Sequence, residues 1–387
     1  MASGGREMGA GEATGGLGGL AVGQSVVVST DSVIYRGQYS STVVGVDDEF
    51  VRVSVPTDRG WVVLVPAGTG VTVRAETEEG PLVFESRVVD RLAGHGRCLV
   101  LARPDAKAKE EPAEEESTCE VVTIASGKGG VGKTTLAVNL GIALCLAGKR
   151  VCVMDADLGT ANVDVLLNLA PRFNVSDLVA GRKRVFEVLV EGPNGLVILP
   201  GGSGLQELTS LDERQFGRLL AEFRQVEKYM DIIIIDTGGG LARNVTTFML
   251  AAKYSVVVTT PEPHAVTDAY ALIKVLTRQG RNAPLRLVVN RARSASEAED
   301  ISRKMVFAAR RFLQFDLEPL GYVLEDEAVP KAIRRQVDFV TQYPKSKASE
   351  CVRGIAAEMG RTGAVEARAT GLSGFVQRLK ALLPRGG

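Results

Sequence analysis

The fold is decided by the stretch Val121-Val122-Thr123-Ile124-Ala125-Ser126-Gly127-Lys128-Gly129-Gly130-Val131-Gly132-Lys133-Thr134-Thr135. It joins a run of apolar residues to a glycine-rich loop of the pattern G-x-x-x-x-G-K-[ST], and an apolar helical segment, 134–147, follows. In such a loop backbone N–H groups surround phosphates, the lysine reaches the β and γ phosphates, and the hydroxyl binds magnesium. The required strand and helix are both predicted here. The stretch therefore predicts a phosphate-binding P-loop.

Apolar strands alternate with helical segments after residue 119. The expected strands lie near 121–125, 151–155, 195–199, 231–236, 255–260, 285–290 and 319–323. These runs lack polar alternation and amphipathic helices separate them, which is typical of a mostly parallel sheet covered by helices on both faces. The predicted class is α/β, and ligands of such sheets bind at the carboxyl ends of the strands.

A different pattern precedes this region. Short valine-rich runs between residues 20 and 103 are separated by turns such as Asp58-Arg59-Gly60, which predicts a small all-β barrel or sandwich. Residues 104–118 are charged and lack large apolar side chains, so they are expected to form a linker. The expected organisation is a disordered leader 1–19, a β-domain 20–103, the linker 104–118, the α/β domain 119–361, a linker 362–371 and a tail 372–387.

Three aspartates follow the apolar strands of the α/β domain. Asp155 and Asp157 come at the end of one strand, and Asp236 ends the run Ile232-Ile233-Ile234-Ile235. Carboxylates beside a P-loop can hold Mg²⁺ through its waters or orient an attacking water. The alternative is that these aspartates only cap helices or lie in loops. Three carboxylates around one P-loop make that alternative weaker.

The composition excludes several classes of protein. Lysine plus arginine and aspartate plus glutamate both number 46, so bulk charge does not favour a nucleic-acid partner. Five scattered cysteines without a C-x-x-C pair predict a reducing compartment and no zinc site. No apolar run reaches about 18 residues, and no signal peptide is evident. The expected location is the cytoplasm.

The loop and its surroundings resemble the MinD/ParA family of ATPases. Residues 128–135 are similar to the deviant Walker A motif of that family, with its extra lysine, and residues 155–164 and 236–241 resemble its switches I and II. Within the family, Thr259-Thr260-Pro261-Glu262-Pro263 and residues 267–274 most resemble the FlhG group (also called FleN or YlxH), which regulates flagellar number and placement. The resemblance covers residues 121–361. It implies ATP and Mg²⁺ as cofactors and slow, stimulated ATP hydrolysis.

The resemblance also implies roles for individual residues. Lys128 is expected to cross an ATP-dependent homodimer to the partner's phosphates, and Asp157 to orient the water; with Lys133 they form the catalytic set. Thr134, Asp155 and Asp236 are the expected metal residues. The expected nucleotide-binding residues are Gly127, Gly129, Gly130, Val131, Gly132, Lys133, Thr134, Thr135, Asn162, Asn290 and Arg291.

Two local features refine this interpretation. Asn290 is followed by Arg291-Ala292-Arg293 instead of the K-x-D that GTPases need, which favours ATP over GTP. The switch II of the family usually has alanine in the middle of its small-residue triplet, whereas this chain has Gly238-Gly239-Gly240. The extra backbone freedom predicts looser switch coupling and an altered hydrolysis rate.

An amphipathic segment ends the chain. Its apolar side chains at helical spacing are Leu372, Phe375, Val376, Leu379, Leu382 and Leu383, with Arg378, Lys380 and Arg385 among or beyond them. This pattern is typical of a helix that binds an anionic membrane surface, and the family resemblance implies the same. The alternative is a last helix packed on the core. Membrane binding would be peripheral, at the inner face of the cell membrane, and dimerisation would strengthen it.

The β-domain resembles the N-terminal domain of YcgR-like flagellar brake proteins through residues 37–46 and 53–56. The D-x-S-x-x-G motif with which PilZ domains bind cyclic di-GMP is absent from residues 20–103, so cyclic di-GMP is not an expected ligand. The expected partners are flagellar assembly proteins, either FlhF or components of the C-ring. The N-terminal D-Q-A-x-x-L-R segment that stimulates FlhF is not visible, however.

The leading hypothesis is an ATP-dependent dimerising ATPase that regulates flagellar number or placement through a membrane–cytosol cycle. A MinD-like division-site ATPase and a ParA-like DNA-segregation ATPase stay open. The second of these would use a local basic stripe of Arg291, Arg293, Arg303, Arg310 and Arg311. A binding module that scarcely hydrolyses ATP is a further alternative.

Overall fold

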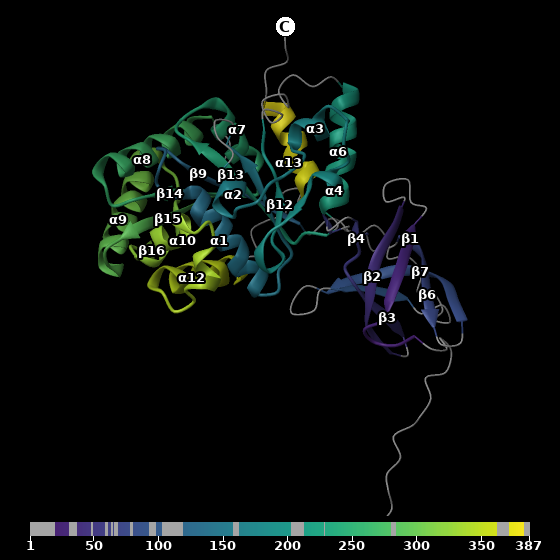
Figure 1. The fold of residues 1–387 in the computed structure, drawn as a ribbon. Helices are drawn as coiled ribbons and strands as arrows, with labels where there is room; N and C mark the ends of the chain where they lie inside the picture. The colour runs from purple at the N-terminus through teal and green to yellow at the C-terminus, as the bar shows by residue number, and fades with distance from the viewer. Residues whose placement is uncertain are drawn as a thin grey trace, which may run out of the picture. The chain divides into compact units, whose positions relative to one another are not determined.

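The computed structural model describes residues 20–30, 37–47, 49–58, 61–62, 65, 69–77, 80–92, 98–102, 119–157, 162–202, 213–227, 229–279, 284–361 and 371–382. The chain divides into two compact units, residues 1–113 and 114–387 (Figure 1). Each unit has its own apolar core.

The first unit is a closed antiparallel barrel. Its strands are β1 (Ser25–Thr30), β2 (Gly37–Val46), β3 (Phe50–Ser54), β4 (Thr57–Asp58), β5 (Trp61–Val62), β6 (Gly70–Thr77), β7 (Gly80–Leu92) and β8 (Cys98–Ala102). Six of them follow the order β1-β6-β7-β8-β3-β2, and β2 pairs again with β1, while the short β4 and β5 extend from β2. Alternate residues, such as Val26 and Val28 or Val51 and Val53, fill the interior. The predicted small all-β barrel is confirmed.

The second unit contains one eight-stranded sheet. Its strands are β9 (Glu120–Ser126), β10 (Val151–Ala156), β11 (Val190–Glu191), β12 (Val197–Leu199), β13 (Ile232–Gly239), β14 (Tyr254–Thr259), β15 (Leu285–Ala292) and β16 (Glu318–Leu324). The order is β11-β12-β10-β13-β9-β14-β15-β16, and every neighbouring pair is parallel except β11 with β12. The predicted mostly parallel sheet is confirmed.

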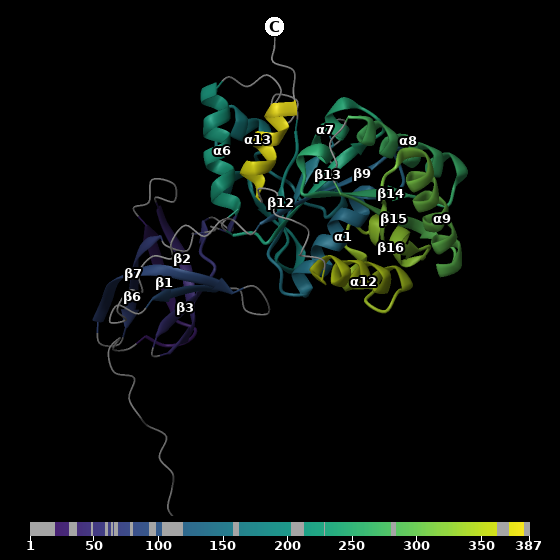
Figure 2. The ribbon, with the colours of Figure 1, turned by 180° about the vertical axis from the view of Figure 1, so that it is seen from behind.

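Helices cover both faces of this sheet. They are α1 (Lys133–Leu146), α2 (Val163–Leu166), α3 (Val175–Val179), α4 (Val185–Val188), α6 (Glu213–Glu227), α7 (Arg243–Ala251), α8 (Pro263–Arg278), α9 (Ala295–Ala308), α10 (Ala328–Arg334), α11 (Phe339–Gln342), α12 (Lys347–Arg361) and α13 (Leu372–Leu382), with a 3-10 turn η1 (Pro193–Gly195) and a π turn η2 (Ala309–Leu313). Alternate strand residues enter different cores: Val122 and Ile234 pack with α1 and α12, whereas Val121 and Ile233 pack with α6, α7 and α13 (Figures 1 and 2). The result is a three-layer sandwich.

The tail helix α13 packs on this unit, beside α6 and α7 in both views (Figures 1 and 2). Its buried apolar side chains are Leu372, Phe375, Val376 and Leu379. The Phe375 ring stacks on Phe248 of α7 with 5.9 Å between centroids, and the Arg378 Nε donates to the Ala251 carbonyl at 2.6 Å. Leu382 is half-buried, and Leu383 lies outside the described residues.

The tail therefore adopts the packed arrangement that the sequence left as the alternative. An apolar helix face satisfies the hydrophobic effect equally by packing on protein or on lipid, so the pattern alone did not decide between them. Membrane contact by these side chains stays a prediction, and it requires α13 to leave this position. Within the described part of the chain, no helix is both long and apolar enough to cross a bilayer.

Candidate nucleotide-binding site

The P-loop connects β9 to α1 and can take its shape only with glycine at two positions. A Cβ at Gly127 would lie 2.1 Å from the carbonyl oxygen of Asp268 in α8. Gly132, which precedes the first turn of α1, has φ +90°, and a Cβ there would lie 2.5 Å from the Asn290 Nδ2 atom. Both contacts are too short for a side chain. The loop is thus packed directly against α8 and the end of β15.

Asn290 at the end of β15 braces the same loop. Its Nδ2 donates to the Val131 carbonyl at 2.7 Å, and its Oδ1 accepts the Arg291 backbone N–H at 3.0 Å. Arg291 takes a left-handed conformation, with φ +56°, to make this turn. The structure places Asn290 and Arg291 at the nucleotide loop, as expected. Recognition of adenine by Asn290 stays a prediction, while its contact with the loop backbone is direct.

Lys133 and Asp236 form the buried centre of the site. Lys133 is 7% exposed, and burial lowers the pKa of its ammonium group while the charges of Asp236 and Asp157 oppose that change. Burial raises the pKa of Asp236 to about 7, and the neighbouring Asp155 and Asp157 carboxylates add to the rise, whereas the Thr134 hydroxyl and Lys133 oppose it. The buried carboxylates of Asp236 and Asp155 and the buried ammonium group of Lys133 thus lie close together, away from water.

The buried oxygens of Asp236 fit a cation. Neither Oδ1 nor Oδ2 has a hydrogen-bond partner of normal geometry among the described residues, and an unpartnered buried carboxylate is costly unless a positive group joins it. Mg²⁺ typically uses one or two protein ligands, with phosphate oxygens and water completing its shell. No cluster of three or more His, Cys, Asp or Glu side chains suited to a metal occurs in the described segments.

Asp155 organises the loop that follows β10. Its Oδ1 accepts the Asp157 N–H at 3.1 Å, and its Oδ2 accepts the N–H groups of Asn162 at 2.9 Å and Val163 at 3.2 Å. Burial raises the pKa of Asp155, and these three hydrogen bonds oppose the rise. Its carboxylate is thus engaged by backbone, so the expected metal role stays a prediction. Asp155 lies in register with Asp236 on the adjacent strand.

Asp157 lies next to the end of β13. A Cβ at Gly238 would come within 3.3 Å of the Asp157 Oδ1, so the two segments face each other closely. Residues 158–161 of the expected switch I lie outside the described residues. Asp157 precedes this segment, and Asn162 follows it as the N-cap of α2.

Gly239 explains the glycine triplet of switch II. A Cβ there would lie 2.7 Å from the Gly129 nitrogen and 2.9 Å from the Lys128 carbonyl carbon. The Gly240 N–H donates to the Ser126 carbonyl at 2.9 Å. Switch II thus touches the P-loop backbone more closely than alanine allows. The sequence alone indicated only greater backbone freedom at Gly239. The structure shows that the lack of a Cβ there permits close contact with the backbone of Lys128 and Gly129.

Lys128 pairs within its own chain. Its Nζ lies 3.7 Å from the Glu262 Oε2, and the His264 Nε2 lies 2.9 Å from the same oxygen. The Lys128 and Glu262 side chains are 41% and 56% exposed, so water screens this pair. Nothing in the sequence marks Glu262 as a functional residue, although it lies in the Thr259–Pro263 stretch. Contact with a partner's phosphates requires Lys128 to leave Glu262.

Those expected site residues that the structure describes thus come together at the carboxyl ends of β9, β10, β13 and β15, whereas the described tail residues lie on α13. Two family models match parts of the chain. Residues 119–286 match a family model described as an AAA domain, and residues 21–104 match one described as flagellar protein YcgR.

Individual relatives extend the match. The chain is 39% identical to the antiactivator FleN of Pseudomonas aeruginosa over 61% of this chain and 85% of FleN. It is 29% identical to the flagellum site-determining protein YlxH of Helicobacter pylori over 69% of this chain and 91% of YlxH. The septum site-determining protein MinD of Pyrococcus horikoshii, solved with Mg-ADP, is 26% identical with a TM-score of 0.51, covering 65% of this chain and 99% of that one. The chain therefore belongs to the MinD/ParA family of P-loop ATPases, with FleN and YlxH among its relatives.

Proposed function

We propose that this chain is an ATPase that dimerises with ATP and regulates flagellar number or placement through a membrane–cytosol cycle. The ATPase activity and the use of ATP and Mg²⁺ follow from the family and from the site. The observation that carries the proposal is the buried Lys133 and Asp236 beside a glycine loop, with the half-exposed Lys128 at its rim. The flagellar role is supported by the similarity of the second unit to FleN and YlxH and of the first unit to the YcgR family model.

The residues divide the chemistry among them. Lys133 and the loop N–H groups bind the phosphates, and Thr134 with Asp236 would hold Mg²⁺, which neutralises phosphate charge when bound. Asp157 orients the attacking water. Lys128 of a second copy supplies positive charge to the developing transition state, as an arginine finger does. Each site is then complete only in the dimer.

The tail supplies the membrane contact in this proposal. Because α13 buries Leu372, Phe375, Val376 and Leu379 against α6 and α7, the chain in this arrangement presents little apolar surface for lipid there. ATP-dependent dimerisation would release two such helices on one particle, and two linked weak sites bind far better than one. We expect the ATP-bound protein to sediment with anionic vesicles and the ADP-bound protein to stay in solution; equal sedimentation would refute the switch.

A DNA-segregation role finds less support in the surface charges. Arg310 Nη2 lies 2.8 Å from the Asp316 Oδ1, and Arg303 pairs with Asp300, so acids accompany the expected basic stripe. A gel shift on non-specific DNA that needs ATP and weakens with salt would favour this role. A division-site role uses the same biochemistry, and cell length with misplaced septa is the phenotype that would distinguish it.

Two experiments test the proposal. Asp157→Ala should abolish ATP turnover while ATP binding is retained, and Asp300→Ala, an exposed acid on α9, should leave both unchanged. Loss of both binding and turnover in Asp157→Ala would contradict the role given to Asp157. In cells, deletion of the chain should change the number or position of flagella, and normal flagella would refute the flagellar part alone.

A further inference from the structure

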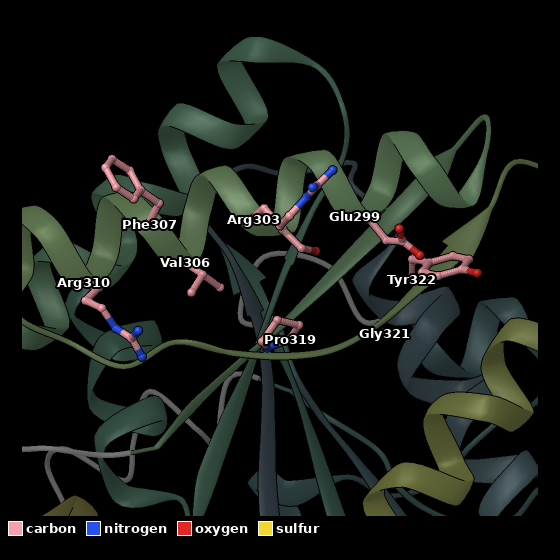
Figure 3. Close-up of a pocket in the computed structure, with 9 residues that line it drawn as sticks. Glu299, Arg303, Val306, Phe307, Arg310, Pro319, Gly321 and Tyr322 are labelled. Carbon is pink, nitrogen blue, oxygen red and sulfur yellow. The ribbon is translucent and has the colours of Figure 1, made fainter.

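A groove of about 590 Å³ lies between α9 and the strand β16 (Figure 3). Val306 of α9 points across it toward Pro319 of β16, and Arg310 lies at the Pro319 end. Glu299 and Tyr322 lie together at the opposite end. The groove therefore runs along the strand, with an apolar floor and charged ends.

The strand on one side of the groove is an open sheet edge. Among the residues that the structure describes, β16 is the last strand of the order and pairs only with β15. Apart from that ladder, no described backbone group of Glu318–Tyr322 forms a hydrogen bond with another backbone group. Pro319 also removes one donor at the start of the strand. The remaining N–H and C=O groups on the outer side are available to an added strand.

Phe307 lies at the rim of the groove, and its ring projects from α9 on the side away from Pro319 (Figure 3). Phe307 is 68% exposed, among the highest values of the described large apolar side chains. Phe312, on the next turn, is 69% exposed but does not line the groove. Exposed aromatic rings beside arginines are typical of residues that dominate binding at protein interfaces.

The charges set a polarity along the groove. The Arg310 and Arg303 side chains are 73% and 75% exposed. Arg310 forms an ion pair with Asp316, and Arg303 forms one with Asp300. A guanidinium group has five N–H donors, so both arginines keep donors for a further acceptor. Glu299 lies at the Tyr322 end. Arg303 lies beside Glu299 (Figure 3), so Arg310 is the lining cation at the Pro319 end, and an acidic group of a bound segment is favoured beside it.

We infer that this groove binds an extended segment of a partner protein, which adds a strand to β16 and places a carboxylate near Arg310. Apolar side chains on one face of the segment cover Val306, Pro319 and the Phe307 ring. The open edge supplies main-chain hydrogen bonds, and the charges set the direction of the segment. This site lies outside the nucleotide site, so its test needs neither ATP nor hydrolysis.

Selection of random dodecapeptides on phage against the full-length, nucleotide-free chain tests the inference. We expect enriched peptides in which apolar residues alternate and an acidic residue recurs. Synthetic copies of these peptides should bind the Phe307→Ser and Arg310→Glu variants of the protein about tenfold or more weaker than wild type, as measured by fluorescence anisotropy. The matched variants Phe312→Ser and Arg311→Glu should change affinity by about twofold or less. A peptide with its acid replaced by lysine should regain affinity for Arg310→Glu.

Hydrogen exchange places the bound peptide. The amides of residue 318 and of residues 320–324 should exchange more slowly in its presence, because an added strand pairs with them. No enrichment, peptides that bind all four variants equally, or protection confined to other elements would overturn the inference. A nucleotide-free dimer that Phe307→Ser dissociates, or vesicle binding that it abolishes, would assign the surface to a second copy or to lipid and overturn it too.

Discussion

Glu227 controls how firmly the tail helix is held. It lies at the end of α6, is 7% exposed, and its carboxylate accepts both the N–H and the hydroxyl of Ser373 in the first turn of α13. A carboxylate at a helix N-terminus also interacts favourably with the helix dipole. Hydrogen bonds to a charged group contribute about 1.5–3 kcal/mol. Glu227→Ala should therefore shift the equilibrium between docked and released α13 about 10- to 150-fold toward release.

The assay is sedimentation of the nucleotide-free variant with anionic vesicles, together with hydrogen exchange of residues 371–382. We expect more vesicle-bound protein and faster exchange for Glu227→Ala than for wild type. Glu222→Ala is the matched control, because Glu222 is also buried on α6 but accepts from Arg184 and Val185, beside α4. If Glu227→Ala exchanges faster in α13 yet binds vesicles no better than Glu222→Ala, the tail is a packing element and does not bind membrane.

Three further predictions concern the nucleotide site. Glu262→Gln should free Lys128 and tighten ATP-dependent dimerisation up to about fivefold at low salt, as measured by analytical ultracentrifugation; no change at low salt would refute the cis pairing. Gly239→Ala should reduce ATP turnover because its Cβ forces switch II from the loop, while Gly354→Ala, with open space around its Cβ position, should not; equal turnover would contradict the contact. Because burial raises the pKa of Asp236 above its ordinary value, its ionisation costs folded-state stability as pH rises from about 4 to about 7. In EDTA without nucleotide, urea unfolding should show Asp236→Asn gaining up to about 2 kcal/mol over wild type between about pH 5.5 and pH 8, and a constant difference would contradict the shift.

The features that the sequence predicted are those with local causes. The P-loop needs a strand, glycines and a lysine in one short stretch, and the strands are continuous apolar runs. Both the loop and the strands can therefore be predicted from local sequence. Asp155 and Asp236 could be expected together because parallel strands end at the same edge. The barrel followed from repeated short strands with turns between them.

The features that the sequence did not reveal depend on contacts between distant segments. The pairing of Lys128 with Glu262 joins residues more than a hundred positions apart, and nothing in either stretch announces it. The need for glycine at 239 comes from the backbone of residues 128–129. The docking of α13 depends on an apolar surface assembled from α6 and α7, which no periodicity in the tail can show.

The same contacts suggest how the nucleotide site and the tail communicate. Switch II ends at Leu241, and α7 begins two residues later at Arg243, so a shift of the loop at Gly239 acts on the start of α7. The other end of α7 carries Phe248, which stacks on Phe375, and Ala251, whose carbonyl accepts from Arg378. One short helix therefore follows switch II at its first turn and contacts the tail near its last. Because packed helices move as rigid bodies more readily than they deform, displacement of switch II by a γ-phosphate would loosen the docking of α13. Hydrogen exchange of α13 that responds to ATP in wild type and not in Gly239→Ala would demonstrate this coupling.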